Sequence, residues 1–597
     1  MRKGWWLLLV LKFASCSPNP QEMQARVDEY LKGYTAKYKE LAYAVSLAEW
    51  DLNTKIVEGD TMNAAASKAA KQAYTNFTGS IENIEKARAF LRKREQLLPL
   101  QVLQLEKVLY NAADSPQTIP EVVKERIAAE TAQTEKLFGF SFKIDGKPVT
   151  TNGIDEILRT SKDLNERQRA WEASKEVGKT LKGGLANLQR LRNQTVQALG
   201  YSDYFNYQVS DYGMSTAEMM ALMTKLNREL RPLFRELHTY TRYTLAEKYG
   251  RPVPRELPAH WLPNRWAQDW SAMVNVAGFD LDGVLRAKSP EWIVQQAERF
   301  YMSLGFQPLP QSFWEKSSLY PLPADSPYKK NNHASAWHMD LENDLRSLMS
   351  VEPNTEWYET THHELGHVYY YISYTNDEVP PLLREGANRA YHEAMGSMLG
   401  LASMQRPFVE AIGLMASNGH SDDMQALLKE ALNYLVFIPF SAGTMTNFEH
   451  DLYAGNLPKE QYNQRWWELV KKYQGVAPPT TRGEEFCDAA SKTHINDDAA
   501  QYYDYALSYV ILFQLHDYIA TKILQQDPHA TNYYGNAEVG KFLDGIMRPG
   551  ASRDWREVLR EKTGEDLSAR ALLKYFESVL EHLKKVNEGR EHTLEEI

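Results

Sequence analysis

The sequence has only two cysteines among its 597 residues, no long block of lysine and arginine, and no low-complexity tract. If Cys16 belongs to an export signal or carries a lipid, Cys487 is the one thiol of the mature chain, which excludes an internal disulfide. The formal net charge is −10. Without a basic block, this charge argues against a nucleic-acid or anionic-membrane surface. We therefore expect no nucleic-acid partner.

The composition is that of a globular protein, with 43% apolar and 24% charged residues. A chain of this length predicts either several domains or one large body. Apolar positions recur at helical spacing in most of the chain. The clearest helical patterns cover 21–55, 82–112, 119–137, 154–200, 215–248 and 556–587. Strand signals are sparse, although alternation around an Asp-Gly turn predicts a small hairpin over 140–150. We expect one large, mainly α-helical body.

Residues 1–15 have the pattern of an export signal, because two basic residues precede a short apolar run that is unable to span a bilayer. The letters FASC resemble a lipoprotein cleavage site, which makes Cys16 a candidate for lipidation and 16–24 a short linker. A disordered or mis-started N-terminus is the alternative. A large exported protein without disulfides suits a bacterial envelope. We therefore expect a periplasmic or lipid-anchored protein with no transmembrane span in its mature chain.

The stretch HHELGH places His363, Glu364 and His367 in the pattern H-E-x-x-H. Positions i and i+4 of a helix lie on one face, so the two imidazoles can bind one Zn²⁺. Glu364 lies beside them and is suited to deprotonate a zinc-bound water. A chance match of the pattern is the alternative.

A catalytic zinc site needs a third protein ligand and an open position. The segment RAYHEAMG offers two neighbouring candidates, His392 and Glu393. Adjacent residues of a helix point about 100° apart, so only one of them faces the metal. We predict Glu393 as the ligand and a packing or supporting role for His392. Packing roles are also expected for the tyrosines that continue the helix face of the histidines, Tyr370, Tyr371 and Tyr374.

Together, HHELGH and REGANRAYHEAMG resemble the angiotensin-converting-enzyme family of zinc peptidyl-dipeptidases. Further family-like blocks follow in order: LPAHWLPNRWAQDW, NHASAWHMD, WWELVKKYQGV, SKTHI, YALSYVILFQLH and LLKYFESVLEHL. The resemblance implies a catalytic domain over 25–590, followed by a polar tail over 591–597. It also implies an almost wholly helical fold in two lobes around a deep central cleft, with a lid of N-terminal helices.

The resemblance assigns the metal and its chemistry to four residues. His363, His367 and Glu393 would hold one zinc ion. Glu364 would act as the general base and later as the acid.

It also assigns substrate contacts. His494 and Tyr505 would donate hydrogen bonds to the substrate and the tetrahedral intermediate. His333 and the backbone at Ala334 would line the backbone of an oligopeptide substrate. Its free C-terminal carboxylate would be held by Gln268, Lys492 and Tyr502.

Two departures from the family pattern affect these expectations. Ser397 replaces the aspartate that usually follows the glutamate ligand by one helical turn, and serine is a weaker partner for a zinc histidine. Asn206, Val470 and Asp504 stand where animal members have chloride-binding arginines. We therefore expect that chloride is not required, and that Asp504 supplies a fixed anion near Tyr505.

These observations predict a zinc metallopeptidase, a hydrolase that releases dipeptides from the free C-terminus of oligopeptides. One alternative is a metallocarboxypeptidase that removes single residues, and another is a zinc-dead protein that only binds peptides. The three expected carboxylate-binding residues match the dipeptidase pattern, and the intact ligands and base argue against a zinc-dead protein.

Overall fold

The computed structural model describes residues 19–57, 61–276, 281–323, 325–415 and 423–597. Helices make up 67% of the protein, and the strands of the described residues form three two-stranded sheets. The mainly α-helical class is therefore confirmed, whereas the division into two lobes with a lid stays a prediction. Across the described ranges, the helices are too short or too polar to cross a bilayer.

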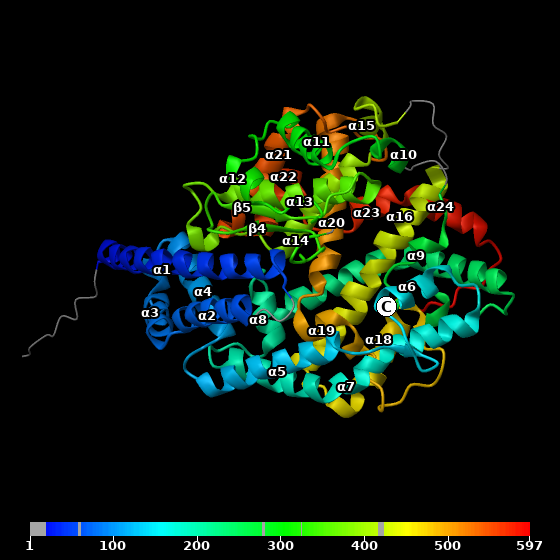
Figure 1. The fold of residues 1–597 in the computed structure, drawn as a ribbon, viewed down its shortest axis with the longest axis horizontal. Helices are drawn as coiled ribbons and strands as arrows, with labels where there is room; N and C mark the ends of the chain where they lie inside the picture. Colours follow the sequence, from blue (N-terminus) through cyan, green and yellow to red (C-terminus); the bar gives the residue numbers. More distant parts are fainter. Residues whose placement is uncertain (1–18, 58–60, 277–280, 324, 416–422) are drawn as a thin grey trace, which may run out of the picture.

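The N-terminal helices pack on one another at one side of the protein (Figure 1). They are α1 (Pro20–Thr54), α2 (Thr61–Thr78), α3 (Ile81–Leu91) and α4 (Pro99–Asp114). A small core of their own includes Val27, Leu105 and Val108. Because α1 begins at Pro20, the predicted linker over 16–24 is wrong for its last five residues. Pro at the first turn and the Asn19 cap explain this early start. The expected export signal and Cys16 lie outside the described residues.

A long helical layer follows in the sequence. It comprises α5 (Pro120–Phe138), α6 (Thr151–Thr160), α7 (Leu164–Gln197), α8 (Tyr204–Ser210) and α9 (Thr216–Tyr249). The predicted hairpin is confirmed between α5 and α6, where β1 (Lys143–Ile144) pairs antiparallel with β2 (Lys147–Pro148). Its Asp-Gly turn has positive φ at both residues, 51° and 77°, as a two-residue hairpin turn requires.

The central segment contains short elements and two long helices. The short ones are β3 (Leu257–Pro258), α10 (Asp282–Leu285), α11 (Pro290–Ser303), α12 (Gln311–Lys316), β4 (Ser335–His338) and β5 (Leu345–Leu348). Strands β4 and β5 pair antiparallel, and β3 pairs parallel with β6 (Val476–Ala477). The long helices, α13 (Thr355–Tyr374) and α14 (Arg389–Ser403), pack against each other and contain the H-E-x-x-H motif and Glu393.

The remaining helices complete one extensive core. They are α15 (Arg406–Ala411), α16 (Asp423–Ile438), α17 (Thr446–Tyr453), α18 (Tyr462–Gln474), α19 (Thr493–Asp497), α20 (Tyr503–Tyr518), α21 (Ala537–Met547), α22 (Trp555–Thr563), α23 (Arg570–Tyr575) and α24 (Glu577–Val586). Helix α20 runs through the centre (Figure 1) and contacts α14, α16 and α23. Most of its residues are buried, on all sides of the helix, because its neighbours surround it.

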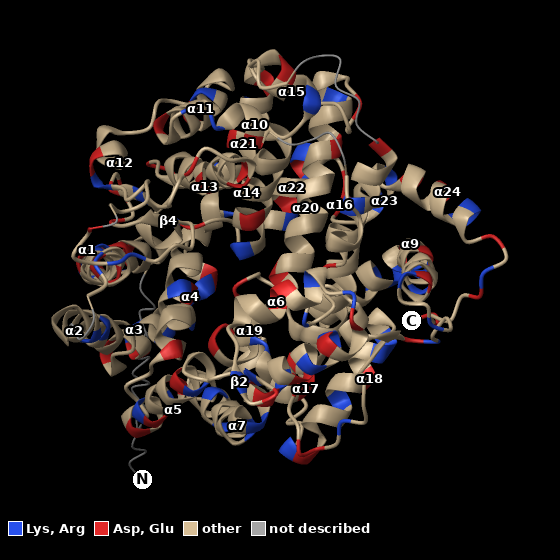
Figure 2. Ribbon diagram, turned by 45° about the vertical axis from the view of Figure 1, so that its right-hand side comes forward, with Lys and Arg blue, Asp and Glu red and all other residues tan. Residues whose placement is uncertain are grey.

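The last residues pack on the protein. Residues 591–597 have no secondary structure, but Leu594 is buried. The Nε of Arg231 on α9 donates a hydrogen bond of 2.8 Å to the carbonyl of Glu595. Elsewhere, basic and acidic residues are interspersed over the helices (Figure 2).

Candidate active site

Two glycines allow α13 and α14 to cross at close range. A Cβ on Gly366 would lie 2.9 Å from the Cα of Gly396, and a Cβ on Gly396 would lie 2.9 Å from the ring of His363. Neither contact is compatible with a larger residue unless the backbone or the ring moves. Asn354 and Asn388 cap the two helices, accepting hydrogen bonds from the third residue of each. At this crossing, the turns of α13 that contain His363 and His367 pack against α14, which contains Glu393.

The crossing brings together the three residues predicted to bind a metal. The Nε2 atoms of His363 and His367 lie 3.1 Å apart, and Nε2 of His363 lies 3.9 Å from Oε2 of Glu393. One donor atom from each residue lies within 4.8 Å of the other two. Burial lowers the pKa of both imidazoles to about 4, so both are in the neutral form that binds metals. Two imidazoles and one carboxylate are a donor set typical of catalytic zinc.

His392 supports this group from the side. Its Nδ1 lies 3.3 Å from Nδ1 of His367, and its ring packs at 4.4 Å from the ring of Tyr370 and 5.2 Å from that of Tyr371. These contacts agree with the packing or supporting role expected for His392. Tyr371 and Tyr374 line the site, and Tyr371 donates a hydrogen bond of 3.2 Å to the carbonyl of Ala336, whereas Tyr370 is buried away from the cavity.

Glu364 lies buried beside the ligands. Its Oε2 has no hydrogen-bond partner in the described part of the chain. Burial and the charge of Glu393 raise the pKa of Glu364 to about 8. A divalent cation on the three neighbouring donors would favour the ionised carboxylate. The unpartnered oxygen is therefore available to accept a proton from a bound water.

A cavity of about 690 Å³ opens onto this group. Its wall includes the three metal-ligand candidates and Glu364. His333 and Ala334 line it from the segment before β4, and Tyr505 lines it from α20. The structure thus places these predicted residues around one space.

The three residues predicted to bind a carboxylate form a cluster beyond Tyr505. Lys492 Nζ donates a hydrogen bond of 2.9 Å to Oε1 of Gln268, and the hydroxyl of Tyr502 lies 3.4 Å from the same oxygen. Lys492 is 4% exposed, and its ammonium lies 4.4 Å from the ring centre of Trp266. Burial, with the charge of Arg265, lowers the pKa of Lys492 to about 7. None of the three lines the 690 Å³ cavity itself.

His494 and Tyr505 connect this cluster to the cavity. Nε2 of His494 lies 3.2 Å from the hydroxyl of Tyr505, and the rings of Tyr502 and Tyr505 pack at 4.8 Å. Ser441, in a π-helical turn over Pro439–Met445, donates a hydrogen bond of 2.6 Å to the carbonyl of Tyr502. Its oxygen also accepts from the backbone N–H of Ala506 at 3.2 Å. Ser441 therefore orients the first turn of α20.

Sequence reasoning missed Arg389, which also lines the cavity. Its guanidinium forms a bidentate ion pair with Asp498, at 2.8 and 2.7 Å, and lies 3.5 Å from Asp504. The hydroxyl of Tyr212 donates to Asp504 and accepts from the N–H of Ala390 at 3.2 Å. These bonds join the start of α14 to the start of α20. In the sequence, the one sign that Arg389 belongs to the site was its position four residues, about one helical turn, before Glu393.

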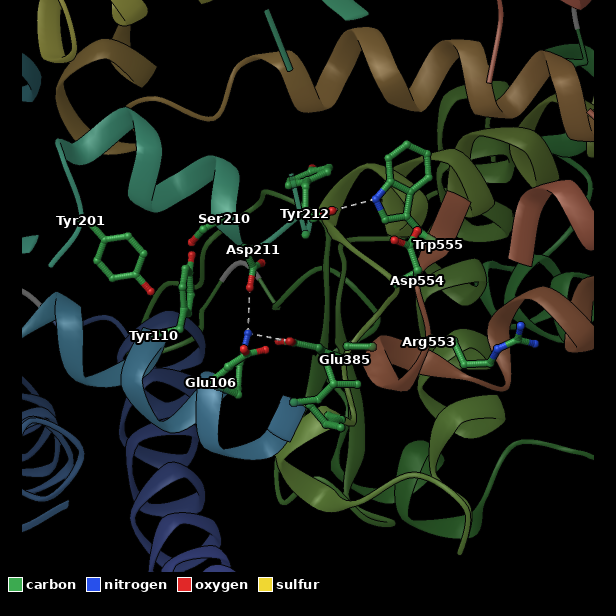
Figure 3. Close-up of a pocket in the computed structure, with 16 residues that line it drawn as sticks. Glu106, Tyr110, Tyr201, Ser210, Asp211, Tyr212, Glu385, Arg553, Asp554 and Trp555 are labelled. Carbon is green, nitrogen blue, oxygen red and sulfur yellow. Dashed lines mark hydrogen bonds and ion pairs between the residues drawn. The ribbon is translucent and has the colours of Figure 1, made fainter. Parts of the chain in front are cut away.

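A neighbouring cavity of about 420 Å³ shares Asp211, Glu385 and Ala387 with the first. Lys107 of α4 crosses it, with its Nζ 3.0 Å from Asp211 and 2.5 Å from Glu385. Figure 3 shows both carboxylates pointing toward this ammonium from different parts of the chain. The ion pairs attach the N-terminal helices to the wall of the site, and periodicity in the sequence did not reveal them.

The family model described as angiotensin-converting enzyme matches residues 20–595. The chain belongs to the angiotensin-converting enzyme family. It is 33% identical over 459 residues to the angiotensin-converting enzyme-like protein Ace3 of Mus musculus, covering 74% of this chain and 61% of that protein. It is 33% identical over 456 residues to the angiotensin-converting enzyme of Rattus norvegicus, covering 74% of this chain but 34% of the relative. The enzyme of Theromyzon tessulatum is 28% identical over 584 residues, 93% and 92% of the two chains.

The chain spans 61% of the length of the Mus musculus relative and 34% of that of the Rattus norvegicus enzyme. Its departures from the family pattern can be located in the structure. Ser397 lines a cavity beside Glu364, and in the described part of the chain it forms no hydrogen bond with His363 or His367. Of the positions expected to bind chloride in relatives, Asn206 donates to Thr216 at 3.4 Å, Val470 is buried, and Asp504 pairs with Arg389.

Proposed function

We propose that this member of the angiotensin-converting enzyme family is a zinc peptidyl-dipeptidase that releases dipeptides from the free C-terminus of oligopeptides. The observation that supports it most is the environment of Lys492. The ammonium is buried beside Gln268 and Tyr502, and no carboxylate of the described chain forms an ion pair with it. A buried charge is costly unless it is paired. The C-terminal carboxylate of a peptide would supply that pair.

The metal-ligand candidates support zinc as the cofactor. His363, His367 and Glu393 would hold it through two nitrogens and one carboxylate, and Glu364, whose buried Oε2 has no partner among the described residues, lines the same cavity. When bound, zinc polarises the scissile carbonyl and lowers the pKa of the attacking water. In this proposal Glu364 accepts a proton from that water and returns it to the nitrogen of the leaving dipeptide.

The other residues bind and orient the peptide. Tyr505 and His494 would donate hydrogen bonds toward the carbonyl oxygen as its negative charge develops. His333 and Ala334 would contact the peptide backbone along the cavity wall. With the carboxylate held by Lys492, the cut would fall at a constant distance from the C-terminus, since the contacts measure chain length rather than sequence.

One defined peptide tests this function. A pentapeptide with a blocked N-terminus and a free C-terminus should lose its last two residues as one dipeptide, as seen by mass spectrometry. Addition of a chelator should stop the reaction, and zinc should restore it. Release of single amino acids would support a metallocarboxypeptidase instead. Binding without cleavage by zinc-loaded protein would support a peptide-binding protein.

We also propose, from the first 16 residues of the sequence, that the protein is exported in a bacterium with Cys16 as a candidate lipid attachment site. The mass of the N-terminal peptide of the mature protein, isolated from the cell envelope, tests this. An N-terminal peptide that begins at Met1 without modification would contradict it.

A further inference from the structure

A third cavity, of about 430 Å³, adjoins one of the metal-ligand candidates, His363 of α13. We call it the acidic pocket, because the described residues of its wall include three carboxylates and no lysine or arginine. Its carboxylates are those of Glu356, Glu359 and Glu364, and its aromatic residues are Trp357, Tyr434 and Tyr509. Because the wall includes His363 and Glu364, the pocket opens directly onto the site of the proposed reaction.

Glu359 is the central acid of the pocket. It lies one helical turn before His363, and its side chain is open to the cavity while Tyr358 and Thr361 on either side are buried. It forms no hydrogen bond or ion pair with the described residues. Its Cγ packs over Gly400 of α14, where an added Cβ would lie 3.5 Å away. Glu359 is exposed to the solvent in the cavity, but the protein around the cavity removes part of the bulk water and raises the pKa of the Glu359 carboxyl.

The position of the pocket relative to Lys492 follows from the aromatic residues that pack between them. A series of aromatic contacts connects the two places. Tyr434 packs against Tyr509 at 4.9 Å, Tyr509 against Phe437 at 5.3 Å, and Phe437 against Tyr502 at 5.9 Å. Tyr502 in turn contacts Gln268, the partner of Lys492. A peptide held at its carboxylate by Lys492 and cut beside Glu364 has two residues between these points.

We propose that the acidic pocket selects a lysine or arginine side chain in the released dipeptide. This inference rests on the proposed function, because it assumes that the C-terminus is anchored at Lys492. The apolar stem of the side chain would pack on Trp357 and Tyr434, and its cationic end would reach Glu359 and Glu356. The peptide would thereby supply the missing partner of Glu359.

The expected preference for lysine depends on the charge of the peptide side chain that enters the pocket. A cationic side chain gains a charge-assisted hydrogen bond, whereas an apolar one of similar length leaves the carboxylate unpaired. An acidic side chain would meet repulsion from Glu356, Glu359 and Glu364. We expect kcat/KM for a lysine peptide to exceed that for its norleucine counterpart by about 10-fold, the usual scale of one charged hydrogen bond.

The experiment compares blocked pentapeptides that carry lysine, norleucine or glutamate at the last, the penultimate or an upstream position. Lysine should be preferred at one of the last two positions and not upstream. Glu359→Gln should reduce that preference to about 2-fold or less, and Glu359→Lys should reverse it in favour of glutamate. Glu352→Gln, an exposed residue outside the pocket, is the matched control and should keep the native preference.

Two outcomes would overturn the inference: equal kcat/KM for lysine and norleucine at both final positions, or a lysine preference that survives Glu359→Gln. Failure of the proposed function is a different result, since norleucine peptides would then release no dipeptide. In that case calorimetric binding of the same peptides to the Glu364→Gln protein gives the comparison without turnover. Tighter binding of the lysine peptide that disappears with Glu359→Gln would support the pocket, and equal binding would overturn it.

Discussion

Nζ of Lys492 donates a hydrogen bond of 2.9 Å to Oε1 of Gln268, although 224 positions separate the two residues. Gln268 follows the 3₁₀ turn at Ala259–Trp261, and Lys492 precedes α19. Their contact is the place at which a substrate carboxylate would be held. Because this contact would fix the position of the peptide C-terminus, the length of the proposed product depends on two segments that are far apart in the sequence.

Removal of this ammonium should weaken substrate binding. We expect Lys492→Ala to raise KM by roughly 10-fold or more, because a charged hydrogen bond contributes about 1.5–3 kcal/mol. The effect on kcat should be smaller if the bond is equally strong in the ground and transition states. Native protein should cut C-terminally amidated peptides much more slowly than free acids. Indifference of the native protein to amidation would place the carboxylate elsewhere.

The same lysine predicts a pH dependence. Burial lowers the pKa of Lys492 to about 7, so its ammonium is charged below that pH and neutral above it. For free-acid peptides, kcat/KM should therefore fall as pH rises through about 7. Lys492→Arg should move the fall to higher pH, since a guanidinium stays charged. C-terminally amidated peptides are the control, and their kcat/KM should not fall in this pH range. If kcat/KM falls at the same pH in the native and Lys492→Arg proteins, the group that titrates is not Lys492.

Glu364 can be tested separately from metal binding. Glu364→Gln keeps the size and polarity of the side chain but removes the proton acceptor. We expect a loss in kcat of at least ~10²-fold, the usual scale of general acid–base catalysis. Elemental analysis should still find about one zinc per chain, because the three predicted ligands remain. Near-native turnover by this variant would reassign the base.

The crossing of α13 and α14 predicts a difference between two glycines of α14. Gly396→Ala would place a Cβ 2.9 Å from the His363 ring, whereas at Gly400 the nearest atom, Glu359 Cγ, is 3.5 Å away. We expect Gly396→Ala to weaken zinc binding by at least ~10-fold, the lower end of the loss seen when metal ligands are misoriented. Gly400→Ala, the matched control, should bind zinc normally. Competition with a fluorescent zinc chelator measures both, and equal affinities would contradict the close approach.

Asp504 predicts a small response to chloride. Its buried carboxyl lies between Arg389 and the hydroxyl of Tyr212, and burial raises its pKa to about 7, so we expect it to supply a negative charge beside Tyr505 above that pH. Replacement of chloride by acetate at constant ionic strength should change kcat/KM by less than about 2-fold, because Arg389 is already paired. Asp504→Asn removes that charge and should make activity depend on chloride. Strong saturable activation of the native protein would show that the fixed anion is insufficient.

The helical class, the hairpin over 140–150 and the close neighbours of the metal motif could be predicted from sequence, because each depends on local periodicity or turn chemistry. His363 and His367 share a helix face by spacing alone. The same geometry shows that only one of His392 and Glu393 can face the metal, and the family resemblance favoured Glu393. The family resemblance then supplied residues such as Gln268 and Lys492, which no local pattern would have joined.

Only the tertiary structure determined which side chains lack partners and which distant pairs meet. Glu359 reads as an ordinary surface acid in the sequence, but residues of α13, α14 and α16 form a cavity around its exposed side chain, and the described residues lining that cavity include no lysine or arginine. Lys107, Asp211 and Glu385 are likewise unremarkable until α4 lies against the loop before α14. The physical reason is that desolvation and pairing depend on all elements around a group. Sequence periodicity determines which face of a helix is buried, whereas the charge and the contacts of that face are decided by what packs against it.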